Sequence, residues 1–277
     1  MADALPSSAA GEQAPVRAPV VREISKSDLK NALIYGWNDF KAAPQFGLLF
    51  GLLYASGGWS IILLATVSGF YYLAYPLAAG FALIAPFVAA GLYEVSRRLE
   101  LRLPLGWGEV IEAIKGGGRR DLGWMALVTT FTFFIWIDIA IFLYAMFFGM
   151  KAPGPWVLMT DILTTSNGLM FFVTGNVIGA MIAFAVFSLT VVSFPLLLDR
   201  DVDFVTAMIT SIRAVKLNLV CMIYWALTIA ALTAVSLLTG LLGLVVVLPW
   251  LGHASWHMYR FAVVAEAGGE TREHLSR

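Results

Sequence analysis

Long apolar runs alternate with short polar connections along most of this chain. Six of the runs are long enough to cross the hydrocarbon core of a bilayer, which takes about 20 helical residues. Lipid offers a backbone no hydrogen-bond partners, so we expect each run to be an α-helix. The predicted spans are approximately 45–67, 72–93, 122–148, 169–197, 219–237 and 241–259.

A shorter segment with one apolar face precedes the first span. From Ser25 to Lys41, apolar residues recur at helical spacing, and Ser25 and Asp28 form a potential capping box. Such a helix, with Trp and basic residues beside its apolar face, is typical of the membrane interface. The predicted interfacial anchors are Trp37, Arg97, Arg98, Arg200 and Arg260.

The same plan recurs along the chain. The segment that begins at Asp28 matches the one that begins at Asp203 in register, and a weaker match lies at 110–114. Each amphipathic piece precedes two spans, and the second span of each pair contains a proline followed by a polar end. The alternative is that hydrophobic helices resemble one another and that basic caps recur for topological reasons. The three prolines are Pro86, Pro195 and Pro249, and we expect each to kink its helix.

We therefore predict an all-α polytopic membrane protein with six transmembrane helices in three pseudo-repeats, each an interfacial amphipathic helix plus a helix pair. Residues 1–24 are rich in Ala, Pro and Ser, lack the apolar core of a signal peptide and are predicted to be a disordered tail. Residues 264–277 are predicted to be a C-terminal tail. The transmembrane domain spans 25–263, with repeats at about 25–100, 107–201 and 203–263.

Composition agrees with this class. The chain is 60 % hydrophobic and 13 % charged, whereas soluble proteins have about 45–50 % apolar and about 25 % charged residues. The formal net charge is zero, but of the Lys and Arg residues only Lys151 falls in a loop on one predicted side. By the positive-inside rule we expect both termini to be cytoplasmic. We expect the lipid bilayer as partner and no nucleic acid.

Two histidines in the last span form the first candidate site. His253 and His257 are four residues apart, so they share a helix face and suit a single metal ion. Alignment on the prolines adds Glu94 and Asp199, if the second spans face a common axis. Structural hydrogen bonding or ion pairing is the plainer alternative, and a proton relay is a third. Haem is disfavoured because axial ligands require facing helices; no Cys-x-x-Cys-His motif is present.

Polar residues inside two other spans form the second candidate site. Asp138 lies well within the third span, where an ionisable group costs about 2.5–3.5 kcal/mol, so we expect it to face other helices or water. Asn176 in the fourth span is a plausible hydrogen-bond partner. The pair is either a proton or substrate site or a polar packing contact.

Four segments of the chain carry a family resemblance. They are GWNDFKAAPQFGLLFGLLYASGG, GFALIAPFVAAGLYEVSRR, VVSFPLLLDRDVDFVTAM and LPWLGHASWHMYR. Together they resemble a bacterial integral-membrane family catalogued as domain of unknown function 2189, over about residues 28–263. Some relatives are labelled as cytochrome c oxidase or an oxidase subunit. The resemblance implies an inner-membrane protein near respiratory complexes and carries over no catalytic residues.

These observations leave three functional hypotheses. The first is a non-catalytic accessory or assembly subunit of a membrane complex of the respiratory, cytochrome c oxidase-like kind. The alternatives are a transporter of small molecules, ions or protons, and a metal-binding membrane protein. Nucleophile-elbow, zinc-protease and dinucleotide motifs are absent, so we do not expect an enzyme and expect no cofactor beyond the possible metal ion.

Overall fold

The computed structural model describes residues 19–81, 89–116, 119–149 and 154–264. This part of the chain is helical and contains no strand, which confirms the all-α prediction. Its elements are α1 (Lys26–Ala42), α2 (Pro44–Val67), the 3-10 helix η1 (Tyr71–Leu73), α3 (Ala74–Phe81), α5 (Ala90–Glu100), α6 (Trp107–Gly116), α7 (Arg119–Phe148), α8 (Pro155–Thr164), α9 (Ser166–Thr190), α10 (Ser193–Asp199), α11 (Phe204–Leu217), α12 (Leu219–Leu238) and α13 (Leu244–Ala262).

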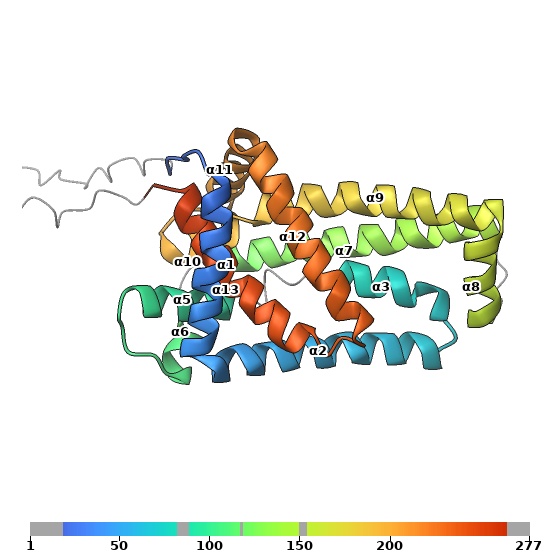
Figure 1. The fold of residues 1–277 in the computed structure, drawn as a ribbon, viewed down its shortest axis with the longest axis horizontal. Helices are drawn as coiled ribbons and strands as arrows, with labels where there is room; N and C mark the ends of the chain where they lie inside the picture. The colour runs from blue at the N-terminus through green and yellow to red at the C-terminus, as the bar shows by residue number, and fades with distance from the viewer. Residues whose placement is uncertain (1–18, 82–88, 117–118, 150–153, 265–277) are drawn as a thin grey trace, which may run out of the picture.

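The helices form an elongated bundle with two different ends. Helices α2, α7 and α9 run along the long axis, and α8 crosses one end (Figure 1). Helices α1, α5, α6, α10 and α11 gather at the other end (Figure 1). The largest buried cluster lies toward this second end, where α10, α11 and α13 contribute half of its buried side chains.

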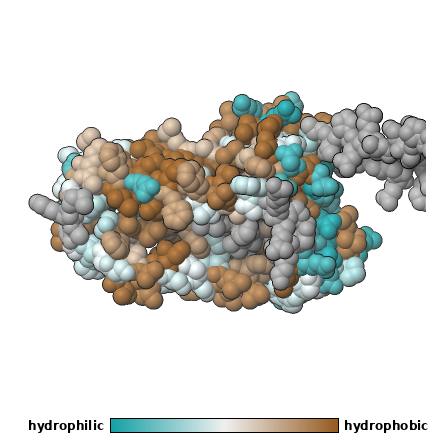
Figure 2. All heavy atoms as spheres, turned by 180° about the vertical axis from the view of Figure 1, so that it is seen from behind, coloured by the Kyte–Doolittle hydropathy of each residue, from teal (hydrophilic) through white to brown (hydrophobic). Residues whose placement is uncertain are grey.

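Four helical segments of the described chain are long and apolar enough to cross a membrane. At most 28 % of the residues in each of these windows are buried, so most of their side chains face outward. Figure 2 shows the resulting surface on one face of the molecule, which is largely hydrophobic. The four segments are Pro44–Val67, Asp121–Phe148, Ser166–Asp199 and Leu219–Leu238.

The other two predicted spans differ from these four. The predicted span at 72–93 is represented by η1, α3 and the start of α5, and residues 82–88, with Pro86, lie outside the described residues. The predicted span at 241–259 is helical as α13, but most of α13 is buried inside the protein. Its polar second half packs against other helices because lipid would not solvate those side chains.

Helix α13 is buried because α1 packs closely along it. The face of α1 predicted to be apolar does turn inward, where Ala32, Gly36 and Phe40 are buried. A Cβ atom at Gly36 would lie 2.6 Å from Cα of Ala254, so only glycine permits this approach. The inner face of α1 therefore meets α13, and Trp37 stacks beside Phe40 at the edge of the contact.

The chain ends of the described region are joined to each other. Val21 and Val263 form an antiparallel β-bridge, and the amide of Val264 donates to the carbonyl of Val20 over 2.9 Å. The amide of Ile24 donates to Asn218 Oδ1 over 2.7 Å. The segment just before α1 is thus held against the start of α12 and the end of α13.

Side-chain caps explain where two helices begin. Ser25 and Asp28 form the predicted capping box of α1, with both reciprocal hydrogen bonds present. Asp203 caps α11 by accepting hydrogen bonds from the amides of Val205 and Thr206. Hydrogen bonds from the hydroxyl and amide of Thr206 lower the pKa of Asp203 below its usual value. Asp28 and Asp203, aligned by the repeat, hold different positions in their helices.

We predict that Gly36→Ala destabilises the protein, although alanine favours a helix by about 1 kcal/mol over glycine. The added Cβ would overlap the backbone of Ala254, and such overpacking typically costs about 1–3 kcal/mol. Thermal unfolding in detergent measures the effect. Gly123→Ala in α7 is the control, since no atom lies within 4 Å of a Cβ there. Equal midpoints for the two variants would contradict the packing.

We predict that Asp203→Ala lowers the free energy of unfolding by about 1 kcal/mol, as the loss of a helix cap typically does. Since the folded-state pKa of Asp203 is below the usual 3.8, the ionised cap stabilises above that pH, and this contribution disappears as pH falls through the folded-state pKa. Unfolding midpoints between pH 3 and 7 test this. The difference from wild type should shrink in acid, and Asp201→Ala, at an exposed aspartate beside the cap, is the control variant.

Candidate functional site

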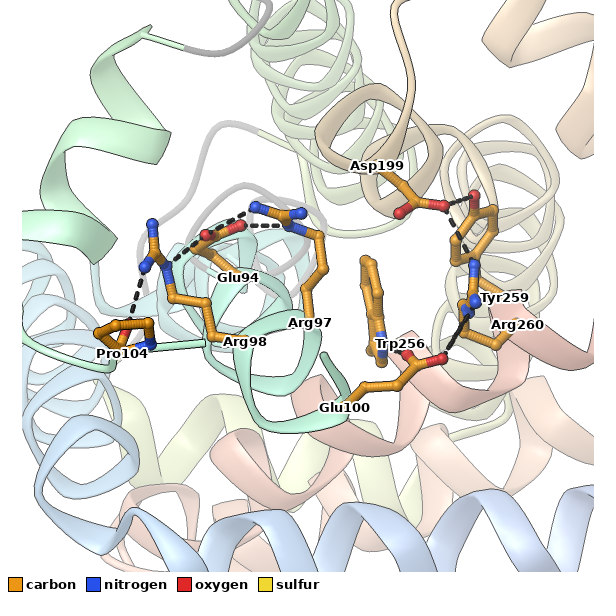
Figure 3. Close-up of polar contacts among 9 residues, drawn as sticks. All are labelled: Glu94, Arg97, Arg98, Glu100, Pro104, Asp199, Trp256, Tyr259 and Arg260. Carbon is orange, nitrogen blue, oxygen red and sulfur yellow. Dashed lines mark hydrogen bonds and ion pairs between the residues drawn. The ribbon is translucent and has the colours of Figure 1, made fainter. Parts of the chain in front are cut away.

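Charged side chains meet where α5, α10 and α13 converge. We call Glu94, Arg97, Arg98, Glu100, Asp199 and Arg260 the polar cluster; Figure 3 shows it. Its three carboxylates face three guanidinium groups, so its formal charges cancel. The cluster lies at the same end of the bundle as α1 and α6 (Figures 1 and 3).

Glu94 is the most deeply buried acid of the polar cluster, with 1 % of its side chain exposed. Arg97 Nε donates to one carboxylate oxygen over 2.8 Å, and Arg98 Nε donates to the other over 2.6 Å. Both arginines lie one helical turn after Glu94, at the spacings that bring side chains together. Arg98 also donates to the carbonyl of Pro104 over 2.8 Å, which ties down the connection to α6.

Arg260 of α13 joins two other carboxylates of the cluster. Its Nε donates to Glu100 over 3.0 Å, and its Nη1 donates to Asp199 over 3.3 Å. Two neighbouring α13 side chains support the same acids: Trp256 Nε1 donates to Glu100 over 2.9 Å, and the Tyr259 hydroxyl donates to Asp199 over 2.6 Å (Figure 3). These bonds fix α13 to the ends of α5 and α10.

The two histidines have separate partners. His253 is fully buried, and its Nδ1 lies 2.8 Å from Oγ of Ser96. Its Nε2 has no hydrogen-bond partner in the described part of the chain. His257 Nε2 lies 2.7 Å from a carboxylate oxygen of Asp39 in α1. An uncharged His253 ring suits this position, because a buried imidazolium there would lack solvent.

The predicted grouping of His253 and His257 with Glu94 and Asp199 does not form through direct bonds. Glu94 binds the α5 arginines, and Asp199 binds Tyr259 and Arg260. Among the residues that the structure describes, no group of three His, Cys, Asp or Glu is placed to hold a metal ion. A metal ion at the two histidines stays a prediction, and the contacts present are structural hydrogen bonds and ion pairs.

Most of the predicted interfacial anchors also have partners inside the protein. Arg97, Arg98 and Arg260 belong to the polar cluster, and Arg200 donates to the carbonyl of Val264 over 2.5 Å. Only Trp37 combines substantial exposure, 38 %, with an apolar ring suited to an interface. The arginines therefore contribute to tertiary structure.

Asp138 and Asn176 do not form the predicted hydrogen bond with each other. Asp138 is exposed on α7 and is not packed against another helix of the described residues. Asn176 Oδ1 instead accepts a hydrogen bond from the Tyr75 hydroxyl over 2.8 Å. Asn176 and Tyr75 line a cavity between α3, α7, α8 and α9, and Asp138 is not among the residues that line it.

Sequence reasoning missed several partners in these sites. Glu100, Asp39 and Ser96 were not singled out, although each bonds to a side chain of α13. The spacing of Glu94 with Arg97 and Arg98 was a readable signal of ion pairs within one helix. The contacts to α13 had no such signal, because they join residues more than 150 positions apart.

The fold and its apolar surface define an α-helical integral membrane protein. A family model described as "Predicted integral membrane protein (DUF2189)" matches residues 73–199, which confirms the family resemblance over this part of the chain. The matched region includes α5, α7, α9 and α10 and excludes α13 with its histidines. No curated protein and no solved structure matches the chain significantly.

We predict that Glu94→Gln strongly destabilises the protein, because Arg97 and Arg98 would lose their buried counter-ion. Breaking a buried ion pair typically costs about 3–5 kcal/mol, and the partial exposure of both arginines (25 % and 17 %) places the expected loss below that range, at about 2 kcal/mol. Thermal unfolding in detergent measures it. Glu23→Gln, at an exposed glutamate, is the control. A Glu94→Gln midpoint equal to that of the control would contradict a structural role for the cluster.

Proposed function

We propose that this protein is a non-catalytic accessory or assembly subunit of a larger bacterial inner-membrane complex of the respiratory, cytochrome c oxidase-like kind. The observation that carries the proposal is the outward position of Asp138 on α7. The polar cluster supports it as well, because its ion pairs and hydrogen bonds hold α5, α10 and α13 together. We further propose six spans in three repeated units, with both termini cytoplasmic.

Asp138 lies deep within a segment of membrane-spanning length. At 1.5 Å per residue it is about 25 Å from Asp121 and about 15 Å from Phe148 along α7. Its helical neighbours are apolar and exposed: Phe134 is 60 % exposed and Phe142 66 %. In the described chain Asp138 makes no hydrogen bond or ion pair.

An acid on such a face is costly in lipid, by about 2.5–3.5 kcal/mol on insertion scales. A helix from another protein that brings a basic or hydrogen-bonding side chain opposite Asp138 would remove most of that cost. Large exposed residues around the acid, Phe134 and Phe142 included, would supply the packing that holds membrane helices together. We therefore infer that this face of α7 is covered by a partner subunit.

Small-molecule transport is the second candidate, because a cavity lies beside α7. No residue with a charged side chain is among those that line the cavity in the described structure, which favours an apolar solute over an ion. Asp138 is not among its lining residues, and this separation weighs against a proton-coupled route through the cavity. Flux of apolar solutes into proteoliposomes would distinguish transport from a subunit role.

Photo-crosslinking in native membranes tests the subunit proposal. We expect p-benzoylphenylalanine at Phe134 to crosslink to one specific membrane protein that also co-purifies in mild detergent at a fixed ratio. Asp138→Leu should reduce the crosslinked fraction at least fivefold, and Asp138→Asn, which keeps a hydrogen-bonding group, should reduce it less.

The matched control places the same crosslinker at Leu227 of α12, which is 59 % exposed. A crosslink to the same partner with equal yield from Leu227 would show that the capture is not specific to α7. Crosslinks from Phe134 to lipid alone, or only to a second copy of this chain, would overturn the proposal.

A further inference from the structure

A cavity of about 580 Å³ lies at the end of the bundle opposite the polar cluster. Helices α3, α7, α8 and α9 and the 3-10 helix η1 surround it, and α8 crosses the bundle there (Figure 1). Its volume falls within the range of about 300–1,000 Å³ that is typical of small-molecule sites. Neither the polar cluster nor the proposed subunit contact involves this cavity.

The walls of the cavity are mainly aromatic. Tyr72 and Tyr144 stack with ring centroids 4.5 Å apart, and the Phe171 ring meets Tyr144 edge-on. Trp136 is buried, and its Nε1 donates to the carbonyl of Pro76 over 2.8 Å, so its ring is held in place. Fixed aromatic faces and edges favour a flat ring as ligand, since ring pairs prefer offset or edge-to-face packing.

One polar pair interrupts this apolar lining. The Tyr75 hydroxyl donates to Asn176 Oδ1, and Asn176 Nδ2 donates to the carbonyl of Phe172, each over 2.8 Å. The amide carries two N–H bonds, so one remains for a further acceptor. Its oxygen is already engaged by Tyr75, which orients the remaining N–H. The pair is therefore suited to hydrogen-bond a carbonyl oxygen.

The cavity opens toward the surface that lipid would cover. Tyr75 is 57 % exposed and Leu163 68 % exposed, and both belong to its lining. Gly175 also lines it, and no atom lies within 4 Å of a Cβ built at that position. A molecule dissolved in the bilayer can thus reach the cavity without crossing the bundle, and Gly175 leaves room for it.

We propose that this cavity binds a lipid-soluble ring compound that carries a carbonyl oxygen, with the aromatic walls packing on the ring and Asn176 donating to the carbonyl. This site is independent of the Asp138 face. Its failure would leave the subunit proposal untouched, and loss of a partner subunit would leave the binding site in place.

The test uses the full chain in phosphatidylcholine nanodiscs, with 2,3-dimethyl-1,4-naphthoquinone as the probe. Bound probe is counted by chromatography, and the amount taken up by empty nanodiscs is subtracted. We expect saturable binding of about one probe per protein. Gly175→Leu should weaken binding at least tenfold because its side chain extends into the cavity, whereas Gly123→Leu, at an equally uncrowded glycine outside the cavity, should stay within about twofold of wild type.

Two comparisons separate ring, carbonyl and chain. Asn176→Leu should weaken naphthoquinone binding about three- to tenfold, the usual effect of one hydrogen bond, and should leave binding of 2,3-dimethylnaphthalene, which lacks the carbonyls, unchanged. Palmitic acid should compete weakly. Absence of saturable binding, equal effects of Gly175→Leu and Gly123→Leu, or stronger binding of palmitic acid than of the ring would overturn the proposal. An Asn176→Leu effect that is equal for both ring compounds would overturn recognition of the carbonyl.

Discussion

The packing of α13 against α1, α5 and α10 is the interaction on which the rest of this structure depends. A mostly buried helix that carries His253, Trp256 and Arg260 is stable only if each polar atom has a partner or is kept uncharged. Arg260 donates hydrogen bonds to Glu100 and Asp199, and Trp256 donates one to Glu100. Gly36 lets α1 approach closely enough to exclude solvent from the opposite side. The same contacts thus hold together segments from the beginning, middle and end of the chain.

The two ends of the bundle divide the molecule chemically. At one end, carboxylates and guanidinium groups cancel each other, and the N- and C-terminal segments are joined by the Val21–Val263 bridge. At the other end, aromatic rings surround a cavity in which Asn176 and Tyr75 are the conspicuous polar pair. The first end is built for stability, because its charged groups are already engaged. The second offers unfilled apolar space and an available hydrogen-bond donor, which is what recognition of a small molecule requires.

Between these ends, the outer surface is arranged for contact with other molecules. Most side chains of the four long apolar helices face outward, which suits lipid. Asp138 on α7 does not suit lipid, because it is an exposed acid between the exposed apolar side chains of Phe134 and Phe142. The cavity and the Asp138 face lie on the same helix and yet have different chemistry. An accessory subunit with its own small-molecule site would use both.

The sequence by itself determined the class of the protein, because apolar runs of span length, the Ser25–Asp28 cap and the i, i+4 spacing of Glu94 with Arg98 depend only on neighbouring residues. The apolar face of α1 could be predicted from the sequence for the same reason. The sequence alone did not predict that α13 would be buried, that His253 would lie beside Ser96, or that Asp138 would be exposed. A helix has the same periodicity whether lipid or protein covers it, so the partner of each face is decided only when distant segments pack. The tertiary structure therefore separated the two histidines between Ser96 and Asp39, and it alone assembled the aromatic cavity from η1, α3, α7, α8 and α9.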